Sequence, residues 1–447
     1  MIPDTDTDDC QEEPYTAHLA VVNENNPVES TGDIYNDRGV LVLTGGSRID
    51  DAARQHLAGH RLRTPLHLQV SVRHPVAGAA LQETFEDLWT RYPDLLELLE
   101  GTGDQDEFLR TILGVPLPAS VGQHLAVLKQ RVPGTFDKAL FCGQLCWQLA
   151  LEMALHPAQV RAAYIAGLSH DMGLLHIPES VLYSQGELTP KQWQVIRGHV
   201  SLSYRLILDA GNAVPPLTAR AVMEHHERGD GTGYPRGLGA ADLHPLGRVV
   251  ALADSLQAIR AGPLARRRTN LASAVPYLQS NALTHTEAVT RAMFGLLRRS
   301  RLEPVPFNPH DGDARAFAAE LKTRALAIEG APEPLQNLAG TAGRGDPLGL
   351  VAESLLRILH SSGLLTEALT AWLSEAASTE SESVPLTELD TIDLLLAEIA
   401  WQLGHLERVA SESQQPETTG GRAALKSLSR VLSAIRRSQD AATAGTS

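Results

Sequence analysis

The first seventy residues contain short apolar runs separated by turn-forming residues. The segment Asp33–Gly39 has the composition of a hairpin turn, and the apolar run Val40–Leu43 that follows it is typical of a buried strand. Leu66–Val72 alternates between apolar and polar positions, which predicts a further strand. Ile49–His60 has the spacing of a helix. The pattern therefore predicts a small β-containing module near the N-terminus.

From residue 76 onward, apolar residues recur at helical spacing, and prolines mark the ends of the helices. The helices expected in the last third are Asp313–Ile328, Leu348–His360, Leu364–Ala376, Leu386–Val409 and Arg422–Gln439. Linker-like compositions at 377–385 and 414–421 separate some of them. Their apolar stripes need a partner face, either within the chain or across a dimer. We therefore expect a C-terminal bundle that serves interaction or homodimerisation.

These patterns predict a mainly α protein, with a helical bundle at its centre, a small N-terminal α+β module and a C-terminal helical bundle. The expected divisions are a flexible tail at 1–14, the β-containing module at 15–75, a helical connector at 76–134, the chemical domain at 135–308, the helical interaction bundle at 309–440 and a second tail at 441–447.

The amino-acid composition favours a helical globular protein and argues against several other classes. Hydrophobic residues make up 43% of the 447 positions and charged residues 20%, so the chain can bury cores, while an aromatic content of 4% favours helices over sandwiches. A net charge of −15 argues against nucleic-acid or anionic-membrane binding. Three cysteines fit a reducing compartment, and the acidic start does not resemble a signal peptide. We expect a cytoplasmic protein without a membrane span.

The residues that indicate chemistry are concentrated in the central region. They are six histidines and aspartates, in steps of 26 to 28 residues, so each cluster can lie on a separate helix and all can converge on one bundle interior: His170, Asp171, His199, His225, His226 and Asp254. Imidazole and carboxylate ligands suit divalent transition metals such as Fe, Mn, Zn or Ni. Any one of these residues alone would more often be structural, but six at matched spacing predict a metal centre.

A glycine-rich segment follows His225-His226-Glu227 directly. Three glycines within five positions, followed by Tyr234-Pro235, cannot continue a helix and predict a tight loop beside the ligands. Such a loop alone is most often an ordinary turn. Its position after two histidines makes it a candidate for substrate contact, with Gly233 permitting close approach and Tyr234 offering a hydroxyl and a stacking face.

Together these residues resemble an HD-GYP domain, a branch of the metal-dependent HD phosphohydrolases. The segments that match are His170-Asp171-Met-Gly173, His176-Ile-Pro178, Gly198-His199, His225-His226-Glu227, Asp230-Gly-Thr-Gly-Tyr234-Pro235 and Ala251-Leu-Ala-Asp254. The resemblance covers somewhat over a third of the chain. It implies an all-helical domain with a centre of two or three metal ions, and cyclic di-GMP as a substrate hydrolysed to pGpG or GMP in bacterial signalling.

The resemblance also implies roles for individual residues. Asp171, His199, His225 and His226 would hold one ion, and His170, Asp171 and Asp254 a second. Gly233, Tyr234, Pro235 and Arg266 would contact the substrate, and Asp171 would be the residue on which catalysis depends.

Three positions depart from the family pattern. Lys138 stands where the family has its first histidine ligand, Leu174 where it has a lysine, and Pro263 where it has an arginine. A protonated lysine cannot bind a metal, although its charge can replace that of a lost ion. We therefore expect one well-formed metal site and one impaired site, with Lys138 contributing charge to catalysis. Cys142 and Cys146, on the same helical face, are soft ligands in principle but more often core thiols.

Three functions remain open at this point. They are an active cyclic di-GMP phosphodiesterase, a degenerate member that binds the dinucleotide or a partner protein without hydrolysis, and a phosphohydrolase for another nucleotide or phosphoester. The phosphodiesterase is placed narrowly first. Between Arg260 and Arg301 there are eight arginines and one acid, which suits an anionic ligand. A solvated helix face, or contact with the acidic C-terminal third, explains the same stretch about equally well.

Overall fold

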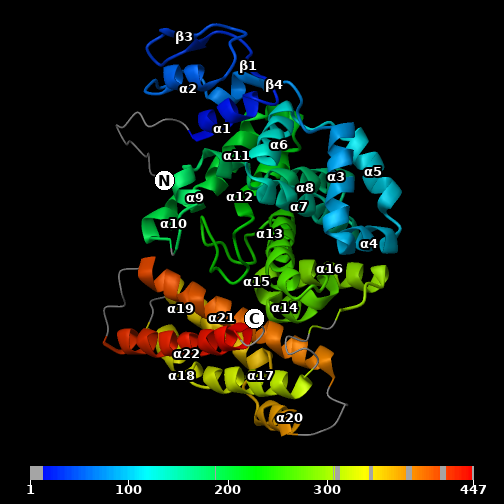
Figure 1. Cartoon of the computed structure of the whole chain (residues 1–447), viewed down its shortest axis with the longest axis vertical. Helices are drawn as coiled ribbons and strands as arrows, with labels where there is room; N and C mark the ends of the chain where they lie inside the picture. The colour runs from blue at the N-terminus through cyan, green and yellow to red at the C-terminus, as the bar shows by residue number, and fades with distance from the viewer. Residues whose placement is uncertain are drawn as a thin grey trace. The chain divides into compact units, whose positions relative to one another are not determined.

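The computed structural model describes residues 14–186, 188–305, 307, 313–341, 346–378, 385–412 and 419–444. The predicted tail at 1–14 thus lies outside the described residues except for Pro14. By contacts the chain divides into two compact units. The first unit contains the residues up to His225 and the segment His244–Asp254, and the second contains His226–Leu243 and the residues from Ser255 onward. The described chain is mainly α-helical, as predicted (Figure 1).

The N-terminal module has more helix and less strand than the sequence pattern predicts. Its elements are α1 (Pro14–Asn23), β1 (Val28–Ser30), β2 (Ile34–Tyr35), β3 (Leu41–Leu43), α2 (Asp51–Leu57), the short 3-10 helix η1 (Leu66–Leu68) and β4 (Val70–Val72). Strands β2 and β3 form the predicted antiparallel hairpin, and β1 pairs antiparallel with β4.

Two predictions for this module need correction. The run Val40–Leu43 is not a buried strand, because Val40 and Leu41 are 57% and 45% exposed and Val42 alone points into the core. The expected strand Leu66–Val72 begins with the turn of η1, so β4 occupies only its second half. Helix α1 was not predicted at all, although Tyr15 and Leu19 are fully buried on it.

Helix α1 packs against the central helices through a cluster of aromatic rings. The ring of Tyr15 stacks against both His124 and His176, with centroids 4.8 Å and 4.7 Å away, and the two histidine rings lie 5.7 Å from each other. His67 meets both histidines edge-on. The Nε2 atoms of His124 and His176 are 3.4 Å apart. Burial, together with the neighbouring His176, lowers the pKa of His124 to about 3. His124 is therefore neutral in the folded protein at ordinary pH.

The predicted connector is helical, and prolines delimit its helices as expected. It contains α3 (Ala79–Arg91), α4 (Pro93–Thr102), α5 (Gln105–Gly114) and α6 (Ala119–Arg131). Pro93 occupies the first turn of α4 and Pro118 directly precedes α6, positions where a missing backbone N–H costs little. Among the described residues no single helix is long and apolar enough to cross a membrane, although α5 and α6 together, bent by 112°, have the length and composition.

The central helices surround the candidate site. They are α7 (Pro133–Glu152), α8 (Pro157–Ser169), η2 (Met172–His176), α9 (Glu179–Leu182), α10 (Pro190–Arg197), α11 (His199–Asp209), η3 (Gly211–Ala213), α12 (Pro216–Glu224) and α13 (Pro245–Ile259). Helices α7 and α8 are closely packed because Gly167 lacks a side chain: a Cβ there would lie 2.5 Å from the carbonyl oxygen of Cys142. This close approach brings the polar residues of α7 to the end of α8.

The second unit begins with the loop 226–243 and continues as short helices. These are η4 (Arg260–Leu264, one π-helical turn), η5 (Leu271–Ala274), α14 (Val275–Ser280), α15 (Ala282–His285) and α16 (Glu287–Ser300). The loop forms no helix, as its glycines and proline predict.

The C-terminal bundle follows, with α17 (Ala314–Ile328), α18 (Pro332–Thr341), α19 (Pro347–Ser361), α20 (Glu367–Ser378), α21 (Leu386–Glu412) and α22 (Thr419–Ala444). The five predicted helices are present, and α18 is an additional one. Helix α22 continues to Ala444, beyond the predicted start of the tail at 441, and residues 445–447 lie outside the description. The predicted linkers lie largely outside it as well, at 379–384 and 413–418.

The apolar stripes of the C-terminal helices find a partner face within the chain. Leu355 and Ile358 of α19 belong to the same buried core as Leu396 and Ile399 of α21 and Leu428 of α22. Figure 1 shows these yellow to red helices lying side by side. This packing accounts for the stripes without a second chain, so dimerisation through the bundle stays a prediction.

Candidate metal centre and substrate loop

Three predicted ligand histidines share one local geometry. The Nδ1 atoms of His170, His199 and His225 donate hydrogen bonds to the carbonyl three residues earlier, at Gly167, Ile196 and Val222, over 2.6–2.8 Å. Each acceptor carbonyl belongs to the last turn of a helix (α8, α10 or α12), where carbonyls have no helical partner. The hydrogen bond places the proton of a neutral ring on Nδ1 and leaves Nε2 as the atom available for a metal.

Asp171 lies at the centre of the first cluster. Its Oδ1 is 3.2 Å from Nε2 of His199 and 3.8 Å from Nε2 of His225, and the two Nε2 atoms are 3.3 Å apart. Ligands that share one ion at bond lengths of about 2.0–2.2 Å lie about 3.0–3.6 Å apart. All three residues are buried. The donor set and its spacing therefore fit one divalent transition ion.

The protonation states of these residues suit such an ion. Burial, together with the neighbouring His170 and His199, lowers the pKa of His225 to about 3, so its Nε2 is free of a proton. Burial alone would raise the pKa of Asp171, but His170 and Lys138 hold it well below its usual value. An ionised carboxylate and a neutral imidazole are the forms that bind metals.

Lys138, on α7, occupies the second predicted subsite. Its Nζ lies 2.8 Å from Oδ2 of Asp171 and 2.5 Å from Oδ1 of Asp254, and so joins the two carboxylates. Burial by itself would lower the pKa of Lys138, but the two aspartates raise it well above the usual value. The ammonium stays charged, and a charged ammonium is a hydrogen-bond donor that cannot bind a metal.

His170 faces the same pair of acids. Its Nε2 is 3.4 Å from Oδ2 of Asp171 and 3.7 Å from Oδ1 of Asp254. Burial would lower the pKa of His170, but Asp171 and Asp254 raise it to about 9. In this arrangement the second subsite contains two cationic side chains rather than a set of neutral ligands.

The cysteines of α7 differ in their distance from this subsite. Cys142 groups with His170 and Asp254, with potential ligand atoms of the three residues within 4.8 Å of one another. Burial raises the pKa of both Cys142 and Cys146 well above the usual value, and Asp254 raises both further. Both thiols are therefore protonated, which agrees with the interpretation as core residues.

His226 is the first residue of the second unit and follows the ligand His225 directly. Its ring stacks on Tyr234, with centroids 4.7 Å apart, and its carbonyl accepts a hydrogen bond from the backbone N–H of Tyr234. His226, a predicted ligand, thus fixes the position of the Tyr234 ring through both contacts. A role of His226 as a metal ligand stays a prediction.

Glu227 shapes the loop from within. Its buried carboxylate accepts hydrogen bonds from the backbone N–H groups of Arg236 (2.7 Å) and Leu238 (2.9 Å). Gly233 lies where the loop folds against itself: a Cβ there would be 2.4 Å from the backbone nitrogen of Arg228. The absence of a side chain at Gly233 thus lets the loop backbone pack closely, and contact of Gly233 with a substrate stays a prediction. Pro235 is exposed at the tip.

Asp230 fixes the loop to the rest of the second unit. Its carboxylate accepts hydrogen bonds from Oγ of Ser354 on α19 (2.6 Å), from Oγ1 of Thr284 on α15 (3.2 Å) and from Thr232 within the loop. Burial would raise the pKa of Asp230, but these hydrogen bonds lower it below the usual value. Sequence analysis missed Ser354, because a single serine on a helix more than a hundred positions away gives no local signal.

The basic stretch 260–301 has mixed roles. Arg267 forms an ion pair with Asp393 of α21, which also pairs with Arg324, so the contact with the acidic C-terminal third is present at this position. Arg266, the predicted substrate residue, is exposed and helical, two residues after the end of η4, and its role stays a prediction.

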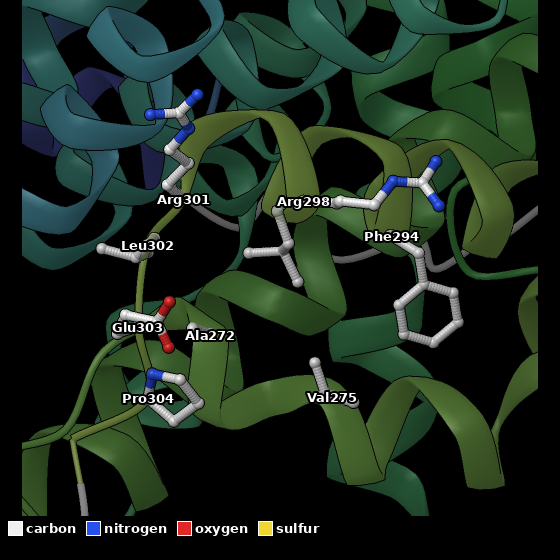
Figure 2. A pocket seen from close by; sticks show the side chains of 9 residues that line it. Ala272, Val275, Phe294, Arg298, Arg301, Leu302, Glu303 and Pro304 are labelled. Atoms are coloured by element: carbon white, nitrogen blue, oxygen red, sulfur yellow. The ribbon is translucent and has the colours of Figure 1, made fainter.

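A cavity of about 450 Å³ lies at the end of this stretch, between η5, α14 and α16. It is lined mainly by apolar side chains, with Arg298, Arg301 and Glu303 among the polar ones. Figure 2 shows the two guanidinium groups pointing in different directions. The two arginines do not form a shared fork for an anion.

Comparison with known proteins places these observations in a family. A family model described as HD domain matches residues 119–288. The matched segment, somewhat over a third of the chain, is similar to the HD domain family and includes all six predicted ligands. The predicted outer boundaries of the domains stay predictions.

The particular relatives within this class are cyclic dinucleotide phosphodiesterases, which confirms the resemblance to the HD-GYP branch. The 3'3'-cGAMP-specific phosphodiesterase 1 of Vibrio cholerae is 36% identical over 154 residues, covering 34% of this chain and 35% of the relative. A cyclic di-GMP phosphodiesterase of Thermotoga maritima is 34% identical over 117 residues, covering 26% and 32%. A cyclic di-GMP phosphodiesterase of Pseudomonas aeruginosa is 30% identical over 213 residues, covering 46% and 50%. The chain thus spans between a third and a half of the length of these relatives.

Proposed function

We propose that this protein is a metal-dependent phosphodiesterase that hydrolyses cyclic di-GMP or a related cyclic dinucleotide to a linear product. The observation that supports this most directly is the cluster of Asp171, His199 and His225, whose potential ligand atoms face one another within a segment similar to phosphodiesterases. His226, next to His225 in the chain, is proposed as the fourth ligand.

The proposed metal content is one ion, Fe, Mn or a similar divalent transition metal, held by the first cluster. Bound there, it would supply a Lewis acid and an activated water for in-line attack at phosphorus. The backbone hydrogen bonds at Nδ1 of His199 and His225 fix the direction of both imidazoles. The second subsite is impaired, because Lys138 stands between its two carboxylates.

Lys138 has a proposed role in the reaction. Its ammonium offsets part of the negative charge of Asp171 and Asp254, and it places a cation where the family resemblance implies a second ion. A fixed cation in a buried site stabilises negative charge that develops on a phosphoryl oxygen. Tyr234, Gly233, Pro235 and Arg266 are proposed to contact the dinucleotide.

A second candidate function is a receptor that binds the dinucleotide, or a protein partner, without hydrolysis. The observation that favours it is the same Lys138 bridge, together with Leu174 in η2, which offers no charge where the resemblance implies a lysine. A different cyclic dinucleotide is the third candidate, since relatives named for 3'3'-cGAMP and for cyclic di-GMP are about equally similar.

One experiment separates these candidates. The full chain is purified without oxygen, its metal content is measured, and it is incubated with Mn²⁺ or Fe²⁺ and with cyclic di-GMP or 3'3'-cGAMP. We expect about one ion per chain and a linear product, and the Asp171→Ala variant should lose both. The surface carboxylate Asp137, which pairs with Arg91 on α3, provides the matched control Asp137→Ala, which should keep both. Tight binding without product would establish the receptor, and a folded chain that binds neither metal nor dinucleotide would contradict both proposals.

Self-association through the C-terminal bundle is a separate proposal. Light scattering of the full chain over a range of concentrations tests it, and a monomer throughout would contradict it.

A further inference from the structure

The N-terminal module contacts both chain segments that carry the proposed ligands Asp171 and His199. The short helix η2 begins directly after Asp171, and α11 begins at His199. Helix α1 of the module packs on η2, and His67 in η1 is bonded to Asp209, the last residue of α11. All of these residues belong to the first compact unit. The module therefore touches two ligand-bearing segments at once, although the proposed ligands lie outside it.

Helices η2 and α11 are in direct contact beside the ligands. The backbone N–H of Gly173 in η2 donates a buried hydrogen bond of 2.8 Å to Oγ of Ser203 in α11. A Cβ at Gly173 would lie 2.3 Å from the carbonyl oxygen of His199. Because the two backbones are packed this closely, a shift of η2 along α11 moves Asp171 relative to His199. Oδ1 of Asp171 and Nε2 of His199 now lie 3.2 Å apart, a spacing that suits one ion.

The module holds η2 through a stacked pair of rings. Tyr15 of α1 and His176, the last residue of η2, have ring centroids 4.7 Å apart and planes 19° apart. Tyr15 is fully buried, so α1 cannot leave η2 without exposing a large aromatic ring to water.

The module holds α11 through a polar contact. Nε2 of His67 donates to Oδ2 of Asp209 over 2.9 Å, and the His67 side chain is only 7% exposed. The ring of His67 also meets that of His176 edge-on, with centroids 6.1 Å apart. The contacts with η2 and with α11 are therefore continuous with each other.

We propose that the N-terminal module is a positioning element for the metal centre, in which Tyr15 and His67 hold η2 and α11 in the register that brings their ligands to one ion. This inference rests on the proposed function, because it needs a metal centre at these ligands. The coupling is reciprocal: displacement of α1 or η1 lowers the affinity for the metal, and the bound metal in turn stabilises the docked module. A partner that shifts the module would thus change metal binding without contacting the site.

The test measures metal binding directly. The Kd of Mn²⁺ is determined by titration calorimetry for the full chain, for His67→Ala, for Asp209→Ala and for the double variant. We expect each single variant to bind Mn²⁺ about three- to thirtyfold more weakly, the range for residues that link two sites. The double variant should bind no more weakly than the weaker single variant, because both substitutions remove the same contact. His67→Gln keeps a nitrogen donor and should retain most of the affinity.

The ring contact is tested separately. Tyr15→Leu removes the flat ring and should weaken Mn²⁺ binding by a similar factor, whereas Tyr15→Phe keeps the ring and should retain most of the affinity. Hydrolysis of cyclic di-GMP by the weakened variants should recover at saturating Mn²⁺, because the ligands themselves are unchanged. A variant that had merely lost its structure would not recover.

Arg73→Ala is the matched control within the module. It breaks an exposed ion pair with Glu29, and both partners belong to the module, so the Kd of Mn²⁺ should not change. Denaturant unfolding of each variant ensures that only folded chains are compared. Unchanged Mn²⁺ affinity in Asp209→Ala and Tyr15→Leu would overturn the inference, and so would losses that multiply in the double variant.

The failure of this inference differs from that of the proposed function. A wild-type chain that binds Mn²⁺ and hydrolyses cyclic di-GMP, with unchanged affinity in the variants, overturns the positioning role alone. A folded wild-type chain that binds no Mn²⁺ overturns both.

Discussion

The Nζ atom of Lys138 lies 2.5 Å from Oδ1 of Asp254, a residue that we propose as a metal ligand. The same atom lies 2.8 Å from Oδ2 of Asp171, so one ammonium joins two carboxylates of the proposed second subsite. Because the two acids raise the pKa of the lysine well above its usual value, it remains charged at neutral pH. A second metal ion must therefore displace a bound cation.

Replacement of this lysine by histidine should restore the second subsite. We expect Lys138→His to raise the metal content from about one to about two ions per chain, because a neutral imidazole would join His170 and Asp254 as a ligand. Hydrolysis should rise by about tenfold or more. Metal analysis and product formation measure the two effects. Asp137→Ala on the same helix is the control, and an unchanged metal content in Lys138→His would show that position 138 is not a former ligand position.

The loop should be intolerant of a side chain at Gly233 and tolerant of one at Gly239. A Cβ at Gly233 would lie 2.4–2.5 Å from backbone atoms of Arg228, Glu227 and His226, whereas one at Gly239 would meet nothing within 4 Å. Gly233→Ala is expected to lower the free energy of unfolding by about 1–3 kcal/mol and to remove activity. Gly239→Ala should behave like the wild type. Denaturant unfolding and product formation distinguish the two, and equal behaviour would contradict the loop geometry.

Ser354 should act on the reaction through Asp230. Ser354→Ala removes the shortest hydrogen bond to that carboxylate, and we expect kcat/KM to fall about fivefold, or about 1 kcal/mol. Ser354→Thr keeps a hydroxyl and should restore most of the activity, which a mere packing role would not predict. Metal content should stay unchanged in both variants. A fall in metal content would show that the effect is a general loss of structure.

The histidine cluster behind Tyr15 should make the folded state sensitive to acid. The pKa of His124 is lowered to about 3 and that of His18 to about 4, mainly by burial, from 6.5 in an unfolded chain. The unfolded state therefore binds more protons below pH 6.5, and stability that is complete above this pH is lost as the pH falls toward 4. His124→Asn should reduce the slope of unfolding free energy against pH between 6.5 and 4. The exposed His60→Asn should leave the slope unchanged, and a wild-type slope in His124→Asn would contradict the prediction.

Much of the candidate site could be predicted because its residues occur in short motifs that are recognisable in the sequence. Pairs such as His170-Asp171 and His225-His226 are visible in the sequence, and helical spacing indicates which cluster belongs to which helix. Lys138 could be placed by counting back from the histidine–aspartate pair, with the spacing that the family resemblance implies.

The remaining features depend on contacts that no local pattern encodes. Ser354 lies on α19, more than a hundred positions after the loop that it contacts, and it does not differ locally from an ordinary surface residue. Helix α1 was missed because its buried side chains, including Tyr15 and Leu19, do not form an apolar stripe that stands out from the polar tail before it. The run Val40–Leu43 was wrongly predicted to be a buried strand because its composition is apolar. In the structure, two of its side chains, Val40 and Leu41, are exposed to solvent.

In three histidines of the site, Nδ1 donates a hydrogen bond to the carbonyl three residues earlier. The orientation of each ring is therefore set by the last turn of a helix, which is among the most regular backbone structures. The direction of each imidazole is therefore set by the backbone rather than by neighbouring side chains. The same short unit, a helix end followed by histidine, is a transferable part for building metal sites in designed bundles.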